Sequence, residues 1–345
     1  MTAIRRRAAL WALGAITAAA IATPAAAQTV TLRLHQFLPG QATIPSKALV
    51  PWAQKVEAES GGRLKIQLFH AMQLGGAPPQ LFDQARDGVV DIIWTVLGYT
   101  PGRFNKTEVF ELPFMSGNAE QSSRAIQEYV EKFAADEFKD VKLIAVHTHG
   151  PGLFHTKQPV QGLESLRGMK IRGGSRIINN MLVKLGATPV GMPVPAVTDA
   201  LSKGTIDGTT IPWKVTPSLK VTELVKNHTT FAGAEGLYTQ TFGFVMNKAS
   251  YDKLPPDLKA VIDKNSGIET AAMFGRAMDE GDKAGRAIAE KAGNRIVTLE
   301  PAEVQRWRRT AGTVETDWIA EVKGKGIDGA QLASEARALI AKHKK

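Results

Sequence analysis

The sequence predicts an α/β fold with two similar lobes, each built on a mostly parallel sheet that is flanked by helices. Segments typical of strands and helices alternate along residues 30–94, and the same alternation restarts after Gly150. Two segments, QARDGVVD (Gln84 to Asp91) and ALSKGTID (Ala200 to Asp207), also share a spacing, because each ends a helix at glycine and then reaches aspartate. A recurrent helix-to-strand turn is the alternative explanation of this match. We expect the two lobes to face each other across a cleft.

The first half alternates regularly between the two periodicities. VTLRLHQF, from Val30 to Phe37, alternates apolar and polar residues as a strand does, and residues 46–59 carry apolar side chains at helical spacing. Gly61 and Gly62 end that helix. The expected order is a strand at 30–37, a helix at 46–59, a strand at 64–69, a helix at 78–88 and an apolar strand that ends at Trp94.

The second half repeats this order and then becomes helical. MKIR forms a strand, Ser175 is a candidate N-cap for a helix at 176–185, and TPVGM forms the next strand. Residues 255–291 read as one long helix in which four glycines favour a bend. The glycines are Gly267, Gly275, Gly281 and Gly285. Two further helical segments at 301–319 and 330–342 are expected to pack outside the lobes.

Residues 1–27 have the pattern of a secretory signal peptide. Arg5, Arg6 and Arg7 precede an apolar run from Ala8 to Ile21, and three alanines come before Gln28. The apolar run is shorter than the roughly 20 residues that a membrane-spanning helix needs. We therefore expect cleavage before Gln28, a mature chain in the periplasm and no stable membrane insertion.

Composition excludes several classes of protein. The chain has no cysteine, which excludes disulfides, thiolate metal sites and cysteine nucleophiles. The formal charge is +10, and three of the arginines lie in the predicted signal peptide. This charge suits anionic small molecules better than nucleic acid, because the sequence has no basic motif with interleaved aromatic residues. GKGIDG, at residues 324–329, has dinucleotide-loop spacing but follows a helix rather than a strand. We expect no cofactor and no enzymatic activity.

Three histidines support an alternative from a different class of protein. His147 and His149 alternate along a strand, so that both side chains point to one face, and His155 follows a turn that contains Gly150 and Gly152. These side chains would give a metal-dependent periplasmic protein. Hydrogen-bonding or core roles are the competing interpretation of the same histidines.

Arg172 is the main candidate for a binding residue. It ends the strand MKIR, two glycines follow it, and the next helix begins near Ser175. Ligands of open α/β sheets bind at strand ends, and glycines permit close approach of a ligand. A guanidinium matches a carboxylate with two charge-assisted hydrogen bonds. Neutralisation of a nearby aspartate is the alternative role for this arginine.

Several long segments in one order resemble the solute receptors of tripartite ATP-independent periplasmic (TRAP) transporters. They are GVVDIIWTVLGYTPGRFNKTEVFELPF, LRGMKIRGGS, LGATPVGMPVPAVTDALSKGTIDGTTIPW and GFVMNKASYDKLP. The resemblance implies a type II-like, two-lobed periplasmic binding protein that carries an organic acid to a TRAP membrane permease without catalysis. It also implies that Arg172, in the "GxKIR" strand, forms the salt bridge to the ligand carboxylate. A receptor that feeds an ATP-driven importer is the alternative among binding proteins.

The resemblance also divides the chain and suggests a pocket. We expect a first lobe of residues 28–150 plus about 240–255, a second lobe of residues 151–239, and a long helix with C-terminal helices at 256–345. The candidate pocket residues besides Arg172 are Trp94, Phe154, His155, Trp213, Gln73 and Tyr238. Trp94 and Trp213 could equally close the core.

Departures from the family pattern predict the kind of acid. Some family members carry a second arginine upstream of this strand and an asparagine before the proline, whereas this chain has Phe154 and His155 upstream and Ile211 before Pro212. One arginine and several rings favour a monocarboxylate with an aromatic or apolar body. A second carboxylate would lose its hydration without gaining a partner. A C4-dicarboxylate receptor of the same family is the alternative, and it would need a protonated His155.

Overall fold

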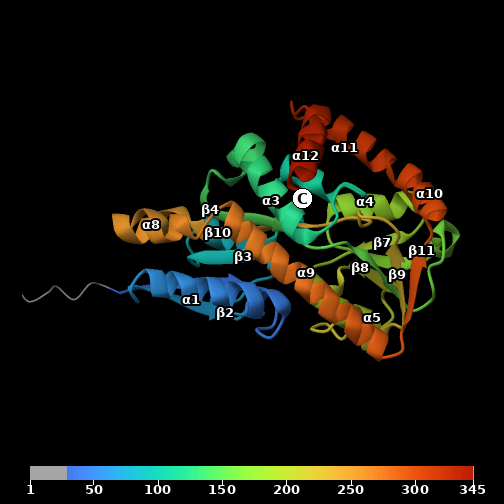
Figure 1. Cartoon of the computed structure of the whole chain (residues 1–345), viewed down its shortest axis with the longest axis horizontal. Coiled ribbons are helices and arrows are strands. Elements are labelled where there is room, and N and C mark those ends of the chain that lie inside the picture. The colour runs from blue at the N-terminus through green and yellow to red at the C-terminus, as the bar shows by residue number, and fades with distance from the viewer. Residues whose placement is uncertain (1–28, 345) are drawn as a thin grey trace, which may run out of the picture.

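The computed structural model describes residues 29–344, which form two mixed β-sheets with helices on their faces (Figure 1). The predicted signal peptide, residues 1–27, and the expected new N-terminus at Gln28 lie outside the described residues. The two sheets and the alternation of helices and strands confirm the two-lobed α/β fold. Residues 84–91 and 200–207, whose sequences are similar, have equivalent places in the two sheets.

The first sheet has the strand order β2-β1-β3-β10-β4. Its strands are β1 (Val30–Gln36), β2 (Leu64–Phe69), β3 (Ile92–Val96), β4 (Val141–Thr148) and β10 (Thr241–Asn247). β1 is parallel to β2 and β3, and β10 is antiparallel to both β3 and β4. One strand, β10, therefore runs against the other four.

The second sheet has the order β11-β9-β5-β8-β6-β7. Its strands are β5 (Leu153–Thr156), β6 (Lys170–Gly173), β7 (Thr188–Gly191), β8 (Gly208–Ile211), β9 (Asn227–Phe231) and β11 (Arg295–Leu299). Here β5 is antiparallel to its neighbours, and the other pairs are parallel. The chain enters β5 and β10 at its first two crossings between the sheets, at residues 149–152 and 232–240, and each of these crossings introduces one reversed strand. The third crossing, through α9, leads to β11, which is parallel to β9.

The repeated aspartate motif has the same geometry in both sheets. Asp91 and Asp207 each stand just before a strand, after a glycine with positive φ. The Asp91 N–H donates to the Arg33 carbonyl, and the Asp91 carboxylate accepts from the Arg33 N–H at 2.8 Å. Asp207 makes the same two hydrogen bonds with Lys170, and its carboxylate also accepts at 2.8 Å. Each aspartate thus fixes a strand to a parallel neighbour, β3 to β1 and β8 to β6.

The helices cover both sheets, and the C-terminal helices span them. The helices are α1 (Val50–Glu59), α2 (Leu81–Arg86), α3 (Ala119–Tyr129), α4 (Arg176–Lys184), α5 (Val197–Ser202), α6 (Val221–Leu224), α7 (Lys248–Asp252), α8 (Pro256–Lys264), α9 (Ile268–Lys291), α10 (Pro301–Ala311), α11 (Thr313–Lys323) and α12 (Gly329–His343). The expected bend of the long helix is a break between α8 and α9 at Gly267, which has a φ of 81°. Strand β11 was not expected, because only helices were predicted from residue 256 onward.

Helix α9 crosses from the first sheet to the second and packs closely on both (Figure 1). A Cβ at Gly275 would lie 2.5 Å from the Glu120 Cα of α3. A Cβ at Gly285 would lie 2.2 Å from the carbonyl oxygen of Trp213, in the short helix η9 (Trp213–Val215). Glycine at these two positions of α9 therefore allows the helix backbone to approach the backbones of α3 and η9.

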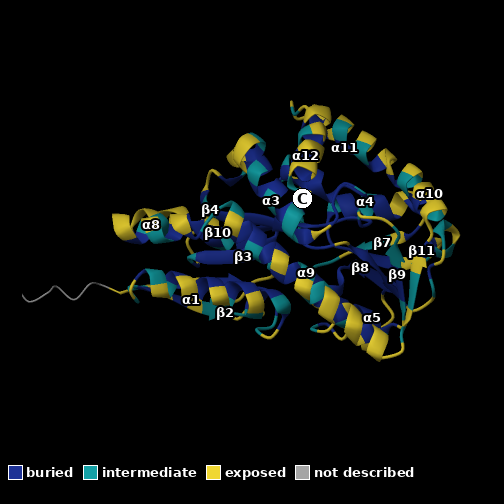
Figure 2. Cartoon of the chain, viewed as in Figure 1, coloured by how far each residue is buried: buried dark blue, intermediate teal, exposed yellow. Residues whose placement is uncertain are grey.

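Burial follows the layers (Figure 2). The inner strands of both sheets are largely buried, the edge strands β2, β7 and β11 are less so, and many exposed residues lie on the outer faces of the helices. No helix within residues 29–344 is long and apolar enough to cross a bilayer.

Gly285→Ala is expected to destabilise the fold. The added methyl group overlaps the Trp213 carbonyl, and because that neighbour is backbone the overpacking should cost about 3 kcal/mol, at the upper end of the usual range. The better helix propensity of alanine offsets only about 1 kcal/mol of this cost. The free energy of unfolding, measured by urea titration, should fall for this variant. Gly324→Ala is the control, because its Cβ would meet only the Glu321 carbonyl at 3.3 Å. Equal stability of Gly285→Ala and the parent chain would contradict the packing argument.

Candidate functional site

The Arg172 side chain is fully buried between the two sheets. Its Nε donates to the Met192 carbonyl at 2.9 Å, and its Nη1 donates to the Thr210 carbonyl at 3.3 Å. Nη2 makes no hydrogen bond of good geometry within residues 29–344, although the Tyr99 hydroxyl lies close enough to interact with the guanidinium, and no carboxylate of that range forms an ion pair with it. The alternative role, neutralisation of a nearby aspartate, is therefore not observed. Burial of an unpaired positive charge costs free energy until an anion binds to it.

The residues after Arg172 bring the first lobe close to this strand end. A Cβ at Gly174 would lie 2.5 Å from the Oε1 atom of Gln240, so glycine leaves room for that side chain. Ser175 caps α4, because its hydroxyl oxygen accepts from the Ile178 N–H at 3.3 Å. The predicted N-cap is confirmed.

Arg172 lines a small cavity to which both lobes contribute. The lining residues are Phe37, Leu38, Trp94, Val96, Tyr99, His149, Arg172, Val194, Ile211, Pro212, Lys214, Val215, Gln240 and Phe242. None of them is acidic. The first lobe supplies a stack of rings, in which Trp94 lies 4.9 Å from Phe37 and 5.1 Å from Phe242, with interplanar angles of 13° and 7°. The second lobe supplies aliphatic side chains, so the cavity has an aromatic wall and an aliphatic wall.

Lys214 is a second buried cation in this cavity, and the sequence analysis missed it. The residue is 5% exposed, and its Nζ lies 5.7 Å from the Trp94 ring centre and 5.5 Å from that of Phe242. In the described part of the chain, no carboxylate lies within 4.0 Å of that ammonium. Burial lowers the pKa of Lys214 to about 8, although the charge of Asp282 opposes this effect. The sequence did contain a signal for this residue, namely a lysine within an apolar stretch, between Trp213 and Val215.

Three more polar side chains line the cavity. The Tyr99 hydroxyl oxygen accepts from the Val194 N–H at 2.8 Å, and burial raises the pKa of that phenol against the opposing charge of Arg172. Gln240 Nε2 and His149 Nε2 are buried, and neither has a partner among the residues that the structure describes. The cavity thus combines apolar walls with several unused hydrogen-bonding groups, as small-molecule sites do.

The predicted pocket residues are only partly brought together. Trp94 lines the cavity with Arg172, and Tyr238 is buried nearby against Gly152. Phe154 packs instead against Trp307 and Phe231. Gln73 is exposed and accepts a hydrogen bond from the His70 N–H. Neither Phe154 nor Gln73 lines the cavity.

His155 and Trp213 belong to a separate buried cluster with His228. His155 Nε2 lies 3.2 Å from the Ile211 carbonyl, which can only accept, so this nitrogen carries the proton. The Nδ1 of His155 then accepts from His228 Nδ1 at 2.7 Å, and His228 Nε2 accepts from Asn294. Burial lowers the pKa of both histidines, that of His228 to about 4. A neutral, fully bonded His155 provides no positive charge for a second carboxylate.

The three histidines of the metal hypothesis do not converge. His147 Nε2 accepts from Trp94 Nε1 at 2.8 Å, and its ring stacks on Phe242, whereas His155 lies in the second sheet. The described chain contains no group of three or more histidine, aspartate or glutamate side chains that could hold a metal ion. The metal-dependent alternative therefore finds no support in residues 29–344.

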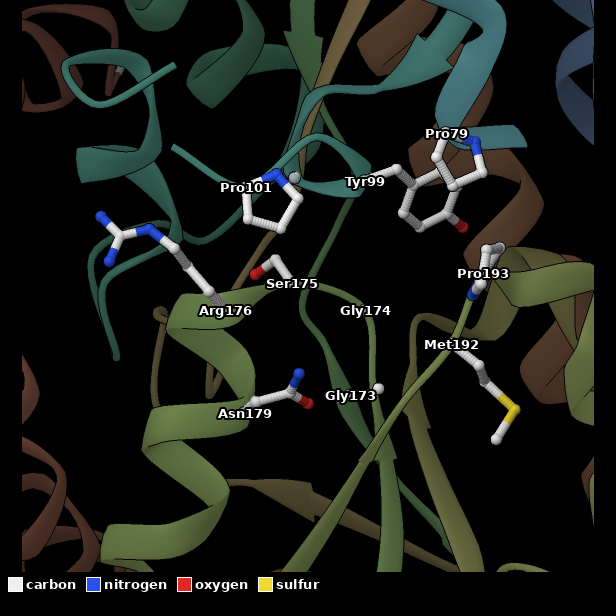
Figure 3. A pocket seen from close by; sticks show the side chains of 12 residues that line it. Pro79, Tyr99, Pro101, Gly173, Gly174, Ser175, Arg176, Asn179, Met192 and Pro193 are labelled. Carbon is white, nitrogen blue, oxygen red and sulfur yellow. The ribbon is translucent and has the colours of Figure 1, made fainter. Parts of the chain in front are cut away.

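A groove of about 270 Å³ lies beside the cavity, and Tyr99 lines both (Figure 3). Pro79, Tyr99 and Pro101 face Ser175, Met192 and Pro193 across it.

Two glutamates of the first lobe lie near this groove. Glu108 forms an ion pair with Arg176 of α4 and accepts a hydrogen bond from Trp318 at 3.0 Å. Glu111 is buried, and its Oε1 accepts from the Thr241 N–H at 3.0 Å. Burial raises the pKa of Glu111 to about 7, although hydrogen bonds from Ser175 and Thr241 act to lower it.

Comparisons with known proteins agree with this arrangement. Residues 37–321 match the family model described as bacterial extracellular solute-binding protein, family 7. A TRAP solute-binding protein from Rhodoferax ferrireducens T118, in complex with copurified benzoate, is 52% identical, with a TM-score of 0.90 over 91% of this chain and 98% of that one. A marine metagenome TRAP protein with 3-hydroxybenzoate is 49% identical, with a TM-score of 0.91 over 92% and 100%. A Bordetella bronchiseptica TRAP protein with (R)- and (S)-mandelate is 32% identical, with a TM-score of 0.84 over 91% and 99%.

Glu111→Gln is expected to change how stability depends on pH. Because burial raises the pKa of Glu111 in the folded state, its neutral form is favoured, and this contribution is lost as pH rises from about 4.5 through about 7. The stability of the variant relative to the parent should therefore increase by up to roughly 3 kcal/mol between pH 5 and pH 8, measured by denaturant titration. Glu280→Gln, at an exposed site, should give a constant difference. A constant difference for Glu111→Gln as well would contradict the expectation.

Proposed function

The chain belongs to the bacterial extracellular solute-binding proteins, family 7, and we propose that it is a TRAP receptor for an aromatic monocarboxylate. The proposed role is to bind the acid in the periplasm and to deliver it to a TRAP membrane permease, without catalysis. Residues 1–27 would direct export and be removed before Gln28. The family assignment and the export pattern support this location together.

The unpaired guanidinium of Arg172 carries the proposal. Its Nε and Nη1 are held by two carbonyl oxygens, while Nη2 is buried and makes no hydrogen bond of good geometry with the described residues. Carbonyl oxygens orient the guanidinium but do not neutralise it. A ligand carboxylate would supply the missing charge and accept the remaining N–H groups.

The walls of the cavity support an aromatic body for the ligand. The cavity of about 20 Å³ would have to widen before a flat ring could lie between the stack of Phe37, Trp94 and Phe242 and the aliphatic side chains of Val194 and Ile211. Ring–ring packing contributes about 0.5–1.5 kcal/mol beyond the burial of apolar area. The relatives with benzoate, 3-hydroxybenzoate and mandelate support the same class of ligand. A C4-dicarboxylate would use the aromatic wall poorly, so that alternative is not favoured.

Arg172 is 0% exposed, so the ligand would enter only when the lobes separate. Gln240 against Gly174 and Glu108 with Arg176 are contacts that such a motion would break. The two crossing segments, residues 149–152 and 232–240, and helix α9 connect the lobes and would bend.

Aromatic acids are expected to bind, and C4-dicarboxylates are not. A thermal-shift screen followed by calorimetry should show stabilisation by benzoate or a substituted benzoate, because a ligand that binds only the folded state raises its melting temperature. Succinate and malate are the matched negative set. Tight binding of succinate with no response to any aromatic acid would contradict the proposed ligand class and leave the family assignment untouched.

Arg172→Ala is expected to remove measurable binding of the aromatic acid. Loss of one partner of a buried charged pair costs roughly 2–5 kcal/mol, or about 30-fold to several thousand-fold in affinity. Arg172→Lys should also bind weakly, because an ammonium cannot reproduce the planar fork. Calorimetry with Arg167→Ala, an exposed arginine, controls for the loss of net charge. Near-parent affinity of Arg172→Ala would show that this arginine does not hold the carboxylate.

A further inference from the structure

We propose that Lys214 and His149 form a second polar subsite in the cavity, which recognises a hydroxyl group on the aromatic acid. This inference rests on the proposed function, and it narrows the ligand to hydroxy-substituted aromatic acids. Arg172 would bind the carboxylate, and the new subsite would bind a second oxygen atom.

Lys214 provides the donor. Its ammonium is buried at the faces of Trp94 and Phe242, at 5.7 Å and 5.5 Å from the ring centres, and it lines the cavity. A lysine ammonium has three N–H donors and no acceptor, and among the described residues only the backbone N–H of Lys214, not its Nζ, donates a hydrogen bond. Contact with rings offsets only part of the lost hydration. An oxygen atom of the ligand would complete this group.

His149 provides the acceptor. Its Nδ1 lies 2.5 Å from the Gly150 carbonyl oxygen, which can only accept, so Nδ1 carries the proton. Thr239 does not change this assignment, because its hydroxyl donates to the His149 carbonyl at 2.7 Å. Burial lowers the pKa of His149 to about 3, so the ring is neutral and Nε2 holds a lone pair. That Nε2 is buried and has no partner in the described chain, and His149 is one of the residues that line the cavity.

A hydroxyl group matches this donor and acceptor together. Its oxygen accepts from Lys214, and its hydrogen is donated to His149 Nε2. Both protein groups line the same cavity and lie against the Phe242 ring, whose centre is 5.5 Å from Lys214 Nζ and 6.0 Å from the centre of the His149 ring. A second carboxylate would place its negative oxygens against the His149 lone pair. A hydrogen or methyl group would leave both protein groups unpaired.

The first test compares ligands on the unchanged protein. We expect the best of 2-, 3- and 4-hydroxybenzoate to bind roughly 10- to 100-fold more tightly than benzoate in calorimetry, because a hydrogen bond to a charged group is replaced poorly by hydrogen. The matching methoxybenzoate accepts but cannot donate, so it should lose most of this gain. Equal affinities of all three hydroxybenzoates and benzoate would overturn the inference while leaving the proposed function intact.

The second test uses Lys214→Met and His149→Phe, with exposed Lys139→Met as the charge control. In both cavity variants the ratio of hydroxybenzoate to benzoate affinity should fall toward one, because only the hydroxybenzoate loses a hydrogen bond to its hydroxyl group. The control should keep the parent ratio. An unchanged ratio, or an equal loss for both ligands in Lys214→Met, would overturn the inference, since an equal loss means that Lys214 binds the carboxylate. Failure of every aromatic acid to bind the parent chain would instead reject the proposed function.

Discussion

The hydrogen bonds from Arg172 to the carbonyls of Met192 and Thr210 fix a positive charge inside the protein without neutralising it. Both acceptors are backbone oxygens that follow or belong to neighbouring strands, so the position of the guanidinium is set by the sheet itself. Side-chain entropy is therefore lost during folding and not during binding, which favours affinity. The buried charge is tolerable only if the cavity can open to water or hold an anion. This constraint explains why the charge lies between two lobes and not within one.

The two lobes complete the cavity from opposite sides, and glycines permit their close contact. The second sheet supplies Arg172, and the first sheet supplies the rings of Trp94 and Phe242. Gly174 admits the Gln240 side chain, and Gly285 lets α9 approach the segment that carries Lys214. At each of these glycines the segments of the two lobes lie close together, so polar groups of one lobe come within reach of the other. Among the described residues that line the cavity, the second lobe supplies both cations and the first lobe supplies the aromatic wall.

Local sequence patterns predicted the elements and the strand end, but not the direction of side chains. The alternation of strands and helices, the N-cap at Ser175 and the position of Arg172 depend on neighbours in the chain, so the sequence contains them. Phe154 and His155 are adjacent on β5 and point to opposite faces, yet neither faces the cavity, because β5 lies inside its sheet with the cavity beyond one end. Lys214 and the free Nε2 of His149 are meaningful only through contacts between lobes. Contacts between residues that are far apart in the chain leave no pattern in the local sequence, so they could not be predicted from it.

The charges around the cavity favour a ligand with one negative charge. Arg172 has no acidic partner in the described structure, whereas Lys214 feels the charge of Asp282, whose carboxylate accepts from the Lys214 backbone N–H at 2.6 Å. Burial raises the pKa of Asp282 to about 7, and Lys214 acts to lower it, so the two groups partly compensate each other. One ligand carboxylate then balances Arg172. A second carboxylate would meet a cation whose charge Asp282 already offsets in part, and it would lose its hydration for little gain. Ile211, which lines the cavity, offers no polar group to a second anion, so a neutral oxygen is the better partner for Lys214.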